Sequence, residues 1–161
     1  MQTMELTRHS DYALRVLLYL AIYPDRQATI TDIAQAYNIS RNHLMKVVHR
    51  LSKGGYIQTF RGNQGGMRLA RDPSKIVLGQ VVLDMGEKVN LIDCEGQGCP
   101  IVPACVLKRV LGEASQALID VLKRYTLADI VAQPQSLTAL LLAPNAFERD
   151  SKADRVVINK K

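Results

Sequence analysis

Apolar residues recur at helical spacing through the first part of the chain. The span 10–23 predicts a buried helix with Ser10 as its N-cap. A shorter helix is predicted after Thr29, because Asp32 stands three residues further on and the two side chains can form a capping box. A third helix is predicted to follow Ser40 and to reach about residue 53, with apolar positions at i, i+3, i+4 and i+7. Those positions are Leu44, Val47, Val48 and Leu51.

A glycine-rich hairpin is predicted directly after the third helix. Gly54 and Gly55 end that helix, 56–60 has strand character, and 61–66 forms a tip before a return strand at 67–69. A helix, a turn, a second helix and a two-stranded wing are the parts of a winged helix-turn-helix. We therefore expect a DNA-binding domain of this type over residues 1–72, in a fold that is mainly α with a small β wing.

The second region, residues 73–142, is predicted to be helical around a loop at 87–104. A helix is expected over 74–85. A long helix over 104–125 carries apolar residues at alternating intervals of four and three, which is typical of a coiled-coil seam. We call this the apolar seam; it consists of Leu107, Leu111, Ala114, Leu118, Val121 and Tyr125. A second subunit would cover the seam in a homodimer, but a packing helix within one chain has the same periodicity. The polar residues 143–161 are expected to form a flexible tail.

The basic charge of the chain is concentrated in its first region. The formal net charge is +6, and residues 1–72 hold ten Lys and Arg against five Asp and Glu. No acidic residue lies between Asp32 and Asp72, whereas that interval contains Arg41, Lys46, Arg50, Lys53, Arg61, Arg68 and Arg71. Such a field attracts the phosphates of nucleic acids. The alternative is a solvated basic face without a ligand.

The third helix carries the side chains that we expect to contact DNA. Its N-terminal turn can enter a major groove, where Arg pairs with guanine and Asn with adenine. The residues of this turn are Ser40, Arg41, Asn42 and His43, and those suited to phosphates are Lys46, Arg50 and Lys53. The wing is expected to reach a neighbouring groove through Arg61, Asn63, Gln64, Gly65 and Arg68. Two associated copies would read a pseudo-palindromic operator. Winged helices also serve as protein-interaction modules, and this alternative stays open.

Other classes of protein find less support in the sequence. The longest apolar run, 16–23, is far shorter than the roughly 20 residues that span a bilayer. The first residues lack the features of a secretory signal, so we expect a cytoplasmic protein. No glycine-rich phosphate loop opens a helix after a strand, and no cysteine is paired with an orienting base, so we do not expect an enzyme.

Three cysteines lie close together in the loop before the long helix. Cys94, Cys99 and Cys105 have the spacing C-x4-C-x5-C, and Cys105 stands where the helix begins, so the helix dipole favours its thiolate. Zinc, an iron-sulfur cluster and redox-active thiols all fit three cysteines in a reducing compartment. An all-cysteine metal centre needs a fourth ligand. The candidates are Asp11, His9, Asp93 and Glu95, with His43 and His49 discounted because they lie on the predicted DNA helix.

Five segments, taken together, resemble a known family. They are LTRHSDYALR (6–15), SRNHLMK (40–46), RGNQGG (61–66), PAC (103–105) and YTLAD (125–129). On these segments the chain resembles the NsrR-type repressors, nitric-oxide-sensing proteins within the family of winged-helix regulators that includes IscR. The resemblance covers about residues 4–142.

The resemblance implies a homodimer that holds an iron-sulfur cluster through Cys94, Cys99 and Cys105, either 4Fe-4S or 2Fe-2S. It also implies that Asp11 of the partner subunit is the fourth ligand, with Arg15 supporting it one turn further along. The implied function is a repressor whose operator affinity falls when nitric oxide reacts with the cluster. The alternative is a winged-helix regulator or interaction module with a structural zinc or redox-thiol loop and no response to nitric oxide.

Overall fold

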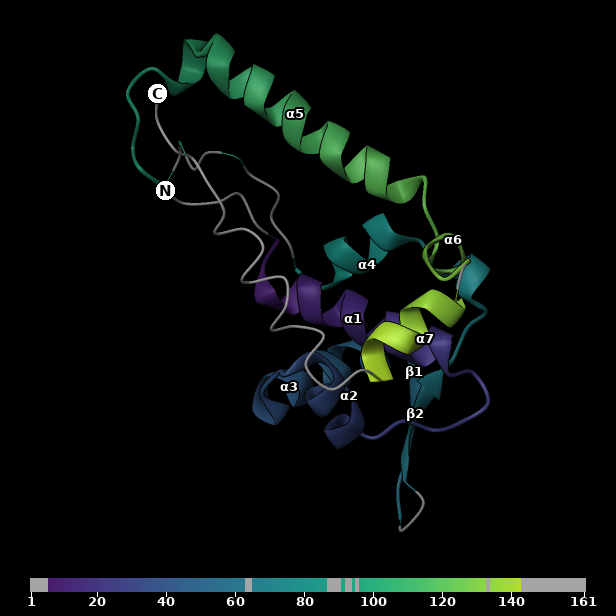
Figure 1. Cartoon of the computed structure of the whole chain (residues 1–161). Helices are drawn as coiled ribbons and strands as arrows, with labels where there is room; N and C mark the ends of the chain where they lie inside the picture. The colour runs from purple at the N-terminus through teal and green to yellow at the C-terminus, as the bar shows by residue number, and fades with distance from the viewer. Residues whose placement is uncertain are drawn as a thin grey trace, which may run out of the picture.

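Seven helices and two strands make up the part of the chain that the computed structural model describes, which is residues 6–62, 65–86, 91, 94, 96–132 and 134–142 (Figure 1). In chain order they are α1 (Arg8–Ile22), α2 (Ile30–Tyr37), α3 (Arg41–Lys53), β1 (Ile57–Phe60), β2 (Gly66–Leu69), α4 (Leu78–Asp84), α5 (Val106–Lys123), α6 (Leu127–Ile130) and α7 (Pro134–Leu142). Two short 3-10 helices, η1 (Pro73–Lys75) and η2 (Val102–Ala104), precede α4 and α5. The fold is mainly α with a small β wing, as the sequence predicts.

Helix α1 lies at the centre of the hydrophobic core. It contacts α2, α3, α4, α6, α7 and β2. Its buried side chains include Ala13, Val16 and Leu17, none of which is accessible to solvent. Ile76 and Leu127, from the second region of the chain, belong to the same buried cluster. A movement of α1 would therefore disturb the packing of most of the molecule.

Helices α2 and α3 form a helix-turn-helix. The capping box predicted from Thr29 and Asp32 begins α2, with both reciprocal hydrogen bonds present. Asn38 ends α2 in the left-handed region at φ 51°, a conformation that Asn tolerates better than most residues. The chain then turns into α3, whose four predicted core positions are all buried.

The wing is an antiparallel pair of strands held against the α1–α2 loop. Strands β1 and β2 pair in the register Ile57 with Leu69 and Phe60 with Gly66. Ala28 adds an isolated bridge to Met67, with backbone N–H···O distances of 3.0 and 2.8 Å. Figure 1 shows the wing projecting from the side of the molecule opposite α5.

Helix α5 packs on the outside of the molecule, separated from α1 by α4 (Figure 1). Its side chains Ser115 and Ile119 are buried. The rest of its surface is exposed or partly exposed. Among the described residues, no helix is both long enough and apolar enough to cross a membrane.

Two predicted helix starts are wrong. Ser10 is not the N-cap of α1. The N-cap is Thr7, whose hydroxyl accepts a hydrogen bond from the amide of Ser10. Ser10 itself lies in the first turn of the helix and is buried. The helix predicted over 74–85 begins only at Leu78. The backbone before it bonds elsewhere, since the carbonyl of Ile76 accepts from the amide of Leu127 at 2.8 Å.

Candidate DNA interface and cysteine loop

We call α3 the reading helix. Its outward face is basic and polar. The predicted contact residues Arg41, Asn42, Lys46 and Lys53 are all exposed on it. Ser40 occupies the N-cap position but makes no side-chain capping bond. No acidic side chain lies in the first turn. The exposed amides and cations of this face are suited to an anionic backbone.

Two further residues share this face and were not among the predicted contacts. Met45 is 50% exposed, and His49 is exposed one turn further along. They follow Asn42 at i+3 and i+7, so the helical period places all three side chains on one face of α3. An exposed Met in such a position can contact a thymine methyl group.

Two exposed residues on one flank of the reading helix, His43 and Arg50, also have neighbours within the chain. The ring of His43 lies 6.3 Å from the ring of Tyr12 on α1. Seven residues further along, Nη1 of Arg50 donates a hydrogen bond to the carbonyl oxygen of Met85 at 2.5 Å. His43 and Arg50 were both predicted to contact DNA. The structure gives each a neighbour within the chain.

The wing presents two arginines, Arg61 after β1 and Arg68 on β2. Arg61 and Arg68 are exposed, and the guanidinium of Arg68 lies 4.9 Å from the centre of the Phe60 ring. Gly65 fits where other residues cannot, because a Cβ on it would lie 2.8 Å from the carbonyl oxygens of Phe60 and Gly62. Asn63 and Gln64, also predicted contacts, lie outside the described residues.

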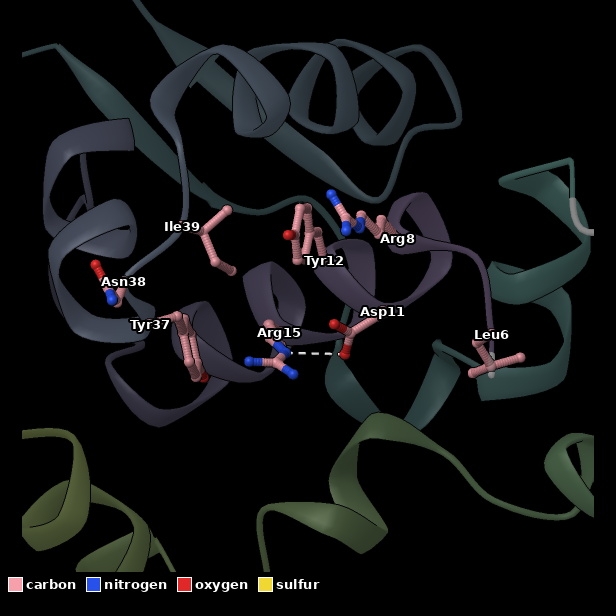
Figure 2. Close-up of a pocket in the computed structure, with 8 residues that line it drawn as sticks. All are labelled: Leu6, Arg8, Asp11, Tyr12, Arg15, Tyr37, Asn38 and Ile39. Atoms are coloured by element: carbon pink, nitrogen blue, oxygen red, sulfur yellow. Dashed lines mark hydrogen bonds and ion pairs between the residues drawn. The ribbon is translucent and has the colours of Figure 1, made fainter. Parts of the chain in front are cut away.

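Asp11 and Arg15 line a pocket of about 610 Å³ between α1 and the turn of the helix-turn-helix (Figure 2). The Arg15 Nε lies 2.8 Å from the Asp11 carboxylate, and the two side chains are 32% and 39% exposed, respectively. Figure 2 shows Arg15 between Asp11 on one side and Tyr37 on the other. The full lining is Leu6, Arg8, Asp11, Tyr12, Arg15, Tyr37, Asn38 and Ile39.

Tyr37 contributes an uncharged side chain to the lining of this pocket. Its hydroxyl is buried and has no hydrogen-bond partner among the described residues. Burial raises the pKa of Tyr37 to about 12. The Arg15 guanidinium lies 5.8 Å from the centre of its ring. Tyr37 is therefore neutral at physiological pH, and the ion pair of Asp11 and Arg15 supplies the charge in this part of the pocket.

The cysteine loop places its third thiol at the start of α5. Cys105 is the N-cap residue, and its Sγ accepts from the amide of Lys108 at 3.4 Å. The amide of Cys99 donates to the carbonyl of Cys94 at 3.1 Å, which folds the first two cysteines into one turn. All three are free thiols of intermediate exposure. Within the described part of a single chain, no three His, Cys, Asp or Glu side chains are grouped closely enough to hold a metal ion.

The apolar seam of α5 is uncovered in the single chain. Leu107 is 59% exposed and Tyr125 50%, and five of the six seam residues are exposed. The large side chains among them are Leu107, Leu118, Val121 and Tyr125. Arg109, Gln116 and Asp120 lie on the other flank of the helix and are exposed. Val106 and Val110, beside the seam, are also exposed, at 62% and 50%, and exposed apolar side chains gathered on one side of a helix are typical of an interface.

A winged helix with a basic reading helix defines the class as a DNA-binding regulator. Residues 6–133 match the Rrf2 family, described as "Iron-dependent Transcriptional regulator". The chain is also 46% identical over 142 residues to the HTH-type transcriptional regulator NsrR of Geobacillus kaustophilus (strain HTA426), covering 86% of this chain and 97% of that protein. The chain belongs to the Rrf2 family of transcriptional regulators, which are not enzymes.

Solved structures agree on the fold. IscR of T. potens matches with a TM-score of 0.64 at 21% identity, covering 97% of this chain and 94% of that one. CymR (YrzC), the global cysteine regulator of B. subtilis, matches with a TM-score of 0.63 at 21% identity, covering 81% and 98%. The winged-helix architecture predicted from the sequence is confirmed.

Proposed function

We propose that this chain is a homodimeric repressor whose affinity for its operator is set by an iron-sulfur cluster that reacts with nitric oxide. The chain is a transcriptional regulator similar to a protein named NsrR. The finer function rests on the cysteine loop, on Asp11 and on the apolar seam. Because its ligand is DNA, we place this function in the cytoplasm.

The donor set of the loop fits an iron-sulfur cluster. Thiolates are the ligands such clusters prefer, and Cys94, Cys99 and Cys105 would supply three of them. The Sγ of Cys105 already accepts an amide hydrogen bond from Lys108 at the N-terminus of α5, which holds this sulfur at the start of the helix. When bound, the cluster would supply iron that reacts with nitric oxide.

The fourth ligand would come from a second copy of the chain. The carboxylate of Asp11 is partly exposed at the pocket and is oriented by Arg15, so an incoming loop can reach it. A carboxylate is a harder ligand than a thiolate and exchanges more readily. The seam of α5 gives the second copy an apolar surface to cover, so dimerisation and ligation would occur together.

Loss of the bond between Asp11 and the cluster would affect the reading helix through α1. Tyr12 follows Asp11 directly and lies against His43 on α3. A small shift of α1 would therefore move the reading helix in its groove. In a dimer both reading helices must engage at once, so a small misalignment removes the gain from bivalent binding.

One observation carries the proposal above the others. An accessible carboxylate stands on α1 beside the turn of the helix-turn-helix, in the pocket that Tyr37, Asn38 and Ile39 also line. A ligand bond made at this position would act directly on the helix-turn-helix, which contains the reading helix. A zinc site held by the cysteines of the loop alone would not make this ligand bond to α1.

The test is an anaerobic titration of operator DNA with three preparations: cluster-loaded protein, the same protein after nitric oxide, and cluster-free protein. We expect tight binding only by the first. Cys99→Ala is the matched variant and should remain a folded dimer without visible absorption. A colourless wild-type protein that contains zinc and binds DNA equally with and without nitric oxide would instead establish the zinc alternative.

A further inference from the structure

The C-terminal end of α4 is tied to the reading helix and to the base of the wing. Arg50, near the end of α3, donates to the carbonyl of Met85 at 2.5 Å. The hydroxyl of Tyr56, at the start of the wing, donates to the carboxylate of Asp84, also at 2.5 Å. We call these four residues the α4 latch.

Each contact of the latch is supported by its surroundings. The second oxygen of Asp84 accepts from Nε2 of Gln80 at 2.7 Å, which orients the carboxylate. Tyr56 is 2% exposed, and burial together with the hydrogen bond to Asp84 raises its pKa above the usual range. The hydroxyl of Tyr56 therefore stays protonated and continues to donate at physiological pH.

Gly86 leaves room for the Arg50 guanidinium. Its φ of +80° is strained for residues with a side chain. A Cβ at this position would also lie 3.2 and 3.4 Å from the two terminal nitrogens of Arg50. The turn that ends α4 is thus shaped around a side chain of the reading helix.

The wing side of the latch is fixed to the reading helix by Arg71. Its Nη2 donates to the carbonyl of Gly54 at 2.7 Å, and its guanidinium lies 4.7 Å from the centre of the Tyr56 ring. The end of α3, the base of β1 and the chain after β2 are held together by these contacts. A displacement of the end of α4 would therefore move the reading helix and the wing together.

The latch lies where the chain enters the cysteine loop at residue 87. It engages the same flank of α3 as His43, which stands seven residues, or about two turns, before Arg50. One end of this flank touches α1, the helix that carries Asp11. The other end touches the element that leads into the loop of the same chain.

We propose that the α4 latch couples the state of a chain's own cysteine loop to its own reading helix and wing. This inference rests on the proposed function, since it needs an operator affinity that depends on the loaded loop. It adds an intra-chain route to the inter-chain route through Asp11. Arg50 is then a positioning residue rather than a phosphate contact.

The test compares Arg50→Gln and Tyr56→Phe with the control Lys53→Gln. The control removes the same charge as Arg50→Gln, one turn further along α3. Among the described residues, the structure shows no side-chain partner for Lys53. The measurement is the ratio of operator affinities of cluster-loaded and cluster-free protein, for an operator fragment selected with loaded wild type. The wild-type ratio is expected to lie in the usual range of such couplings, about 5- to 150-fold, and the two latch variants are expected to lower it by about threefold or more. Lys53→Gln should weaken both forms equally and reduce the salt dependence of binding.

The controls separate the possible failures. Visible absorption and thermal unfolding show whether each variant is loaded and folded, and Tyr56→Phe leaves every charge of the reading helix unchanged. A wild-type ratio of one would refute the proposed function. A normal wild-type ratio that both latch variants retain would refute the latch alone, and an Arg50→Gln variant matching Lys53→Gln would make Arg50 a phosphate contact.

Discussion

The backbone of Gly79 on α4 lies close to the backbone of Lys123 on α5. A Cβ built on Gly79 would lie 2.8 Å from the backbone nitrogen of Lys123 and 2.6 Å from its Cγ. The carbonyl oxygen of Ile119 would lie 3.0 Å away. Because two of these atoms are backbone, they cannot rotate aside, so Gly79 fixes how closely α5 approaches the core.

Gly79→Ala is expected to destabilise the protein. The substitution gains up to about 1 kcal/mol of helix propensity but overpacks the α4–α5 contact, at a cost of about 1–3 kcal/mol. Gly112→Ala on α5 is the matched control, since a Cβ added there would meet no atom within 4 Å, and it should stabilise by about 0.5–1 kcal/mol. Thermal denaturation should give shifts of opposite sign. A stabilised Gly79→Ala would contradict the close approach.

The apolar seam provides a prediction about the oligomeric state. Leu118→Lys is expected to convert the proposed dimer to a monomer, because it places a charge in the centre of the surface that a second copy would cover. Gln116→Lys introduces the same side chain on the opposite flank, beside Asp120, and should leave the dimer intact. Analytical ultracentrifugation distinguishes the two. Two variants with equal sedimentation would show that the seam is not the interface.

The helical elements were predictable because their signals are local. The capping box at Thr29 and the periodic core positions of α3 depend on residues a few positions apart, and the structure reproduces both. The start of α4 was not predictable in this way. Its preceding backbone bonds to residues near 126, about 50 positions along the chain, and no local pattern records such a partner.

The reading helix shows the same limit on predicting the site. Its outward face follows from the helical period, so Asn42 and Lys46 were placed correctly as exposed side chains. Arg50, on the edge of that face, is exposed too, but whether such a residue also bonds within its own protein depends on tertiary contacts. Arg50 bonds to Met85, which lies 35 positions away, and only the folded structure shows it.

Asp11→Ala tests the link between the pocket and the cysteine loop. We expect the variant to keep a coloured cluster on three thiolates but to lose most of the difference in operator affinity caused by nitric oxide. Asp25→Ala removes the same charge from an exposed turn and should behave as wild type. Visible absorption and anaerobic DNA titration provide the measurements. If nitric oxide changed the operator affinity of Asp11→Ala as much as that of wild type, this carboxylate would have no part in sensing nitric oxide.

Base and phosphate contacts on the reading helix can be distinguished. Arg41→Ala should cost about 1–3 kcal/mol on the operator and less on random DNA if its side chain reads a base. Lys46→Ala should weaken binding to both DNAs equally and reduce the slope of log affinity against log salt by about 1. Titrations at several salt concentrations on both DNAs measure these effects. Equal losses on both DNAs for Arg41→Ala would assign it to the backbone.

The capping box of α2 makes the stability of the helix-turn-helix depend on pH. Asp32 accepts from the backbone amide of Thr29 at 2.7 Å and from its hydroxyl at 2.8 Å, and these bonds lower the pKa of Asp32 below its ordinary 3.8. A carboxyl whose pKa is lower in the folded state stabilises the protein above its unfolded pKa. That contribution is lost as the pH falls through the folded value.

Thr29→Ala is therefore expected to lower the free energy of unfolding by about 1 kcal/mol at neutral pH, the usual value of an N-cap. The difference from wild type should shrink as the pH falls below the ordinary Asp pKa of 3.8 and through the lowered pKa of folded Asp32, because protonation weakens the bond of Asp32 to the Thr29 hydroxyl. Thr31→Ala, which takes no part in the capping box, is the control. Urea denaturation from pH 3 to pH 7 gives the comparison. A difference that stays constant over this range would mean that the hydroxyl stabilises α2 through the Asp32 amide alone, without its carboxylate.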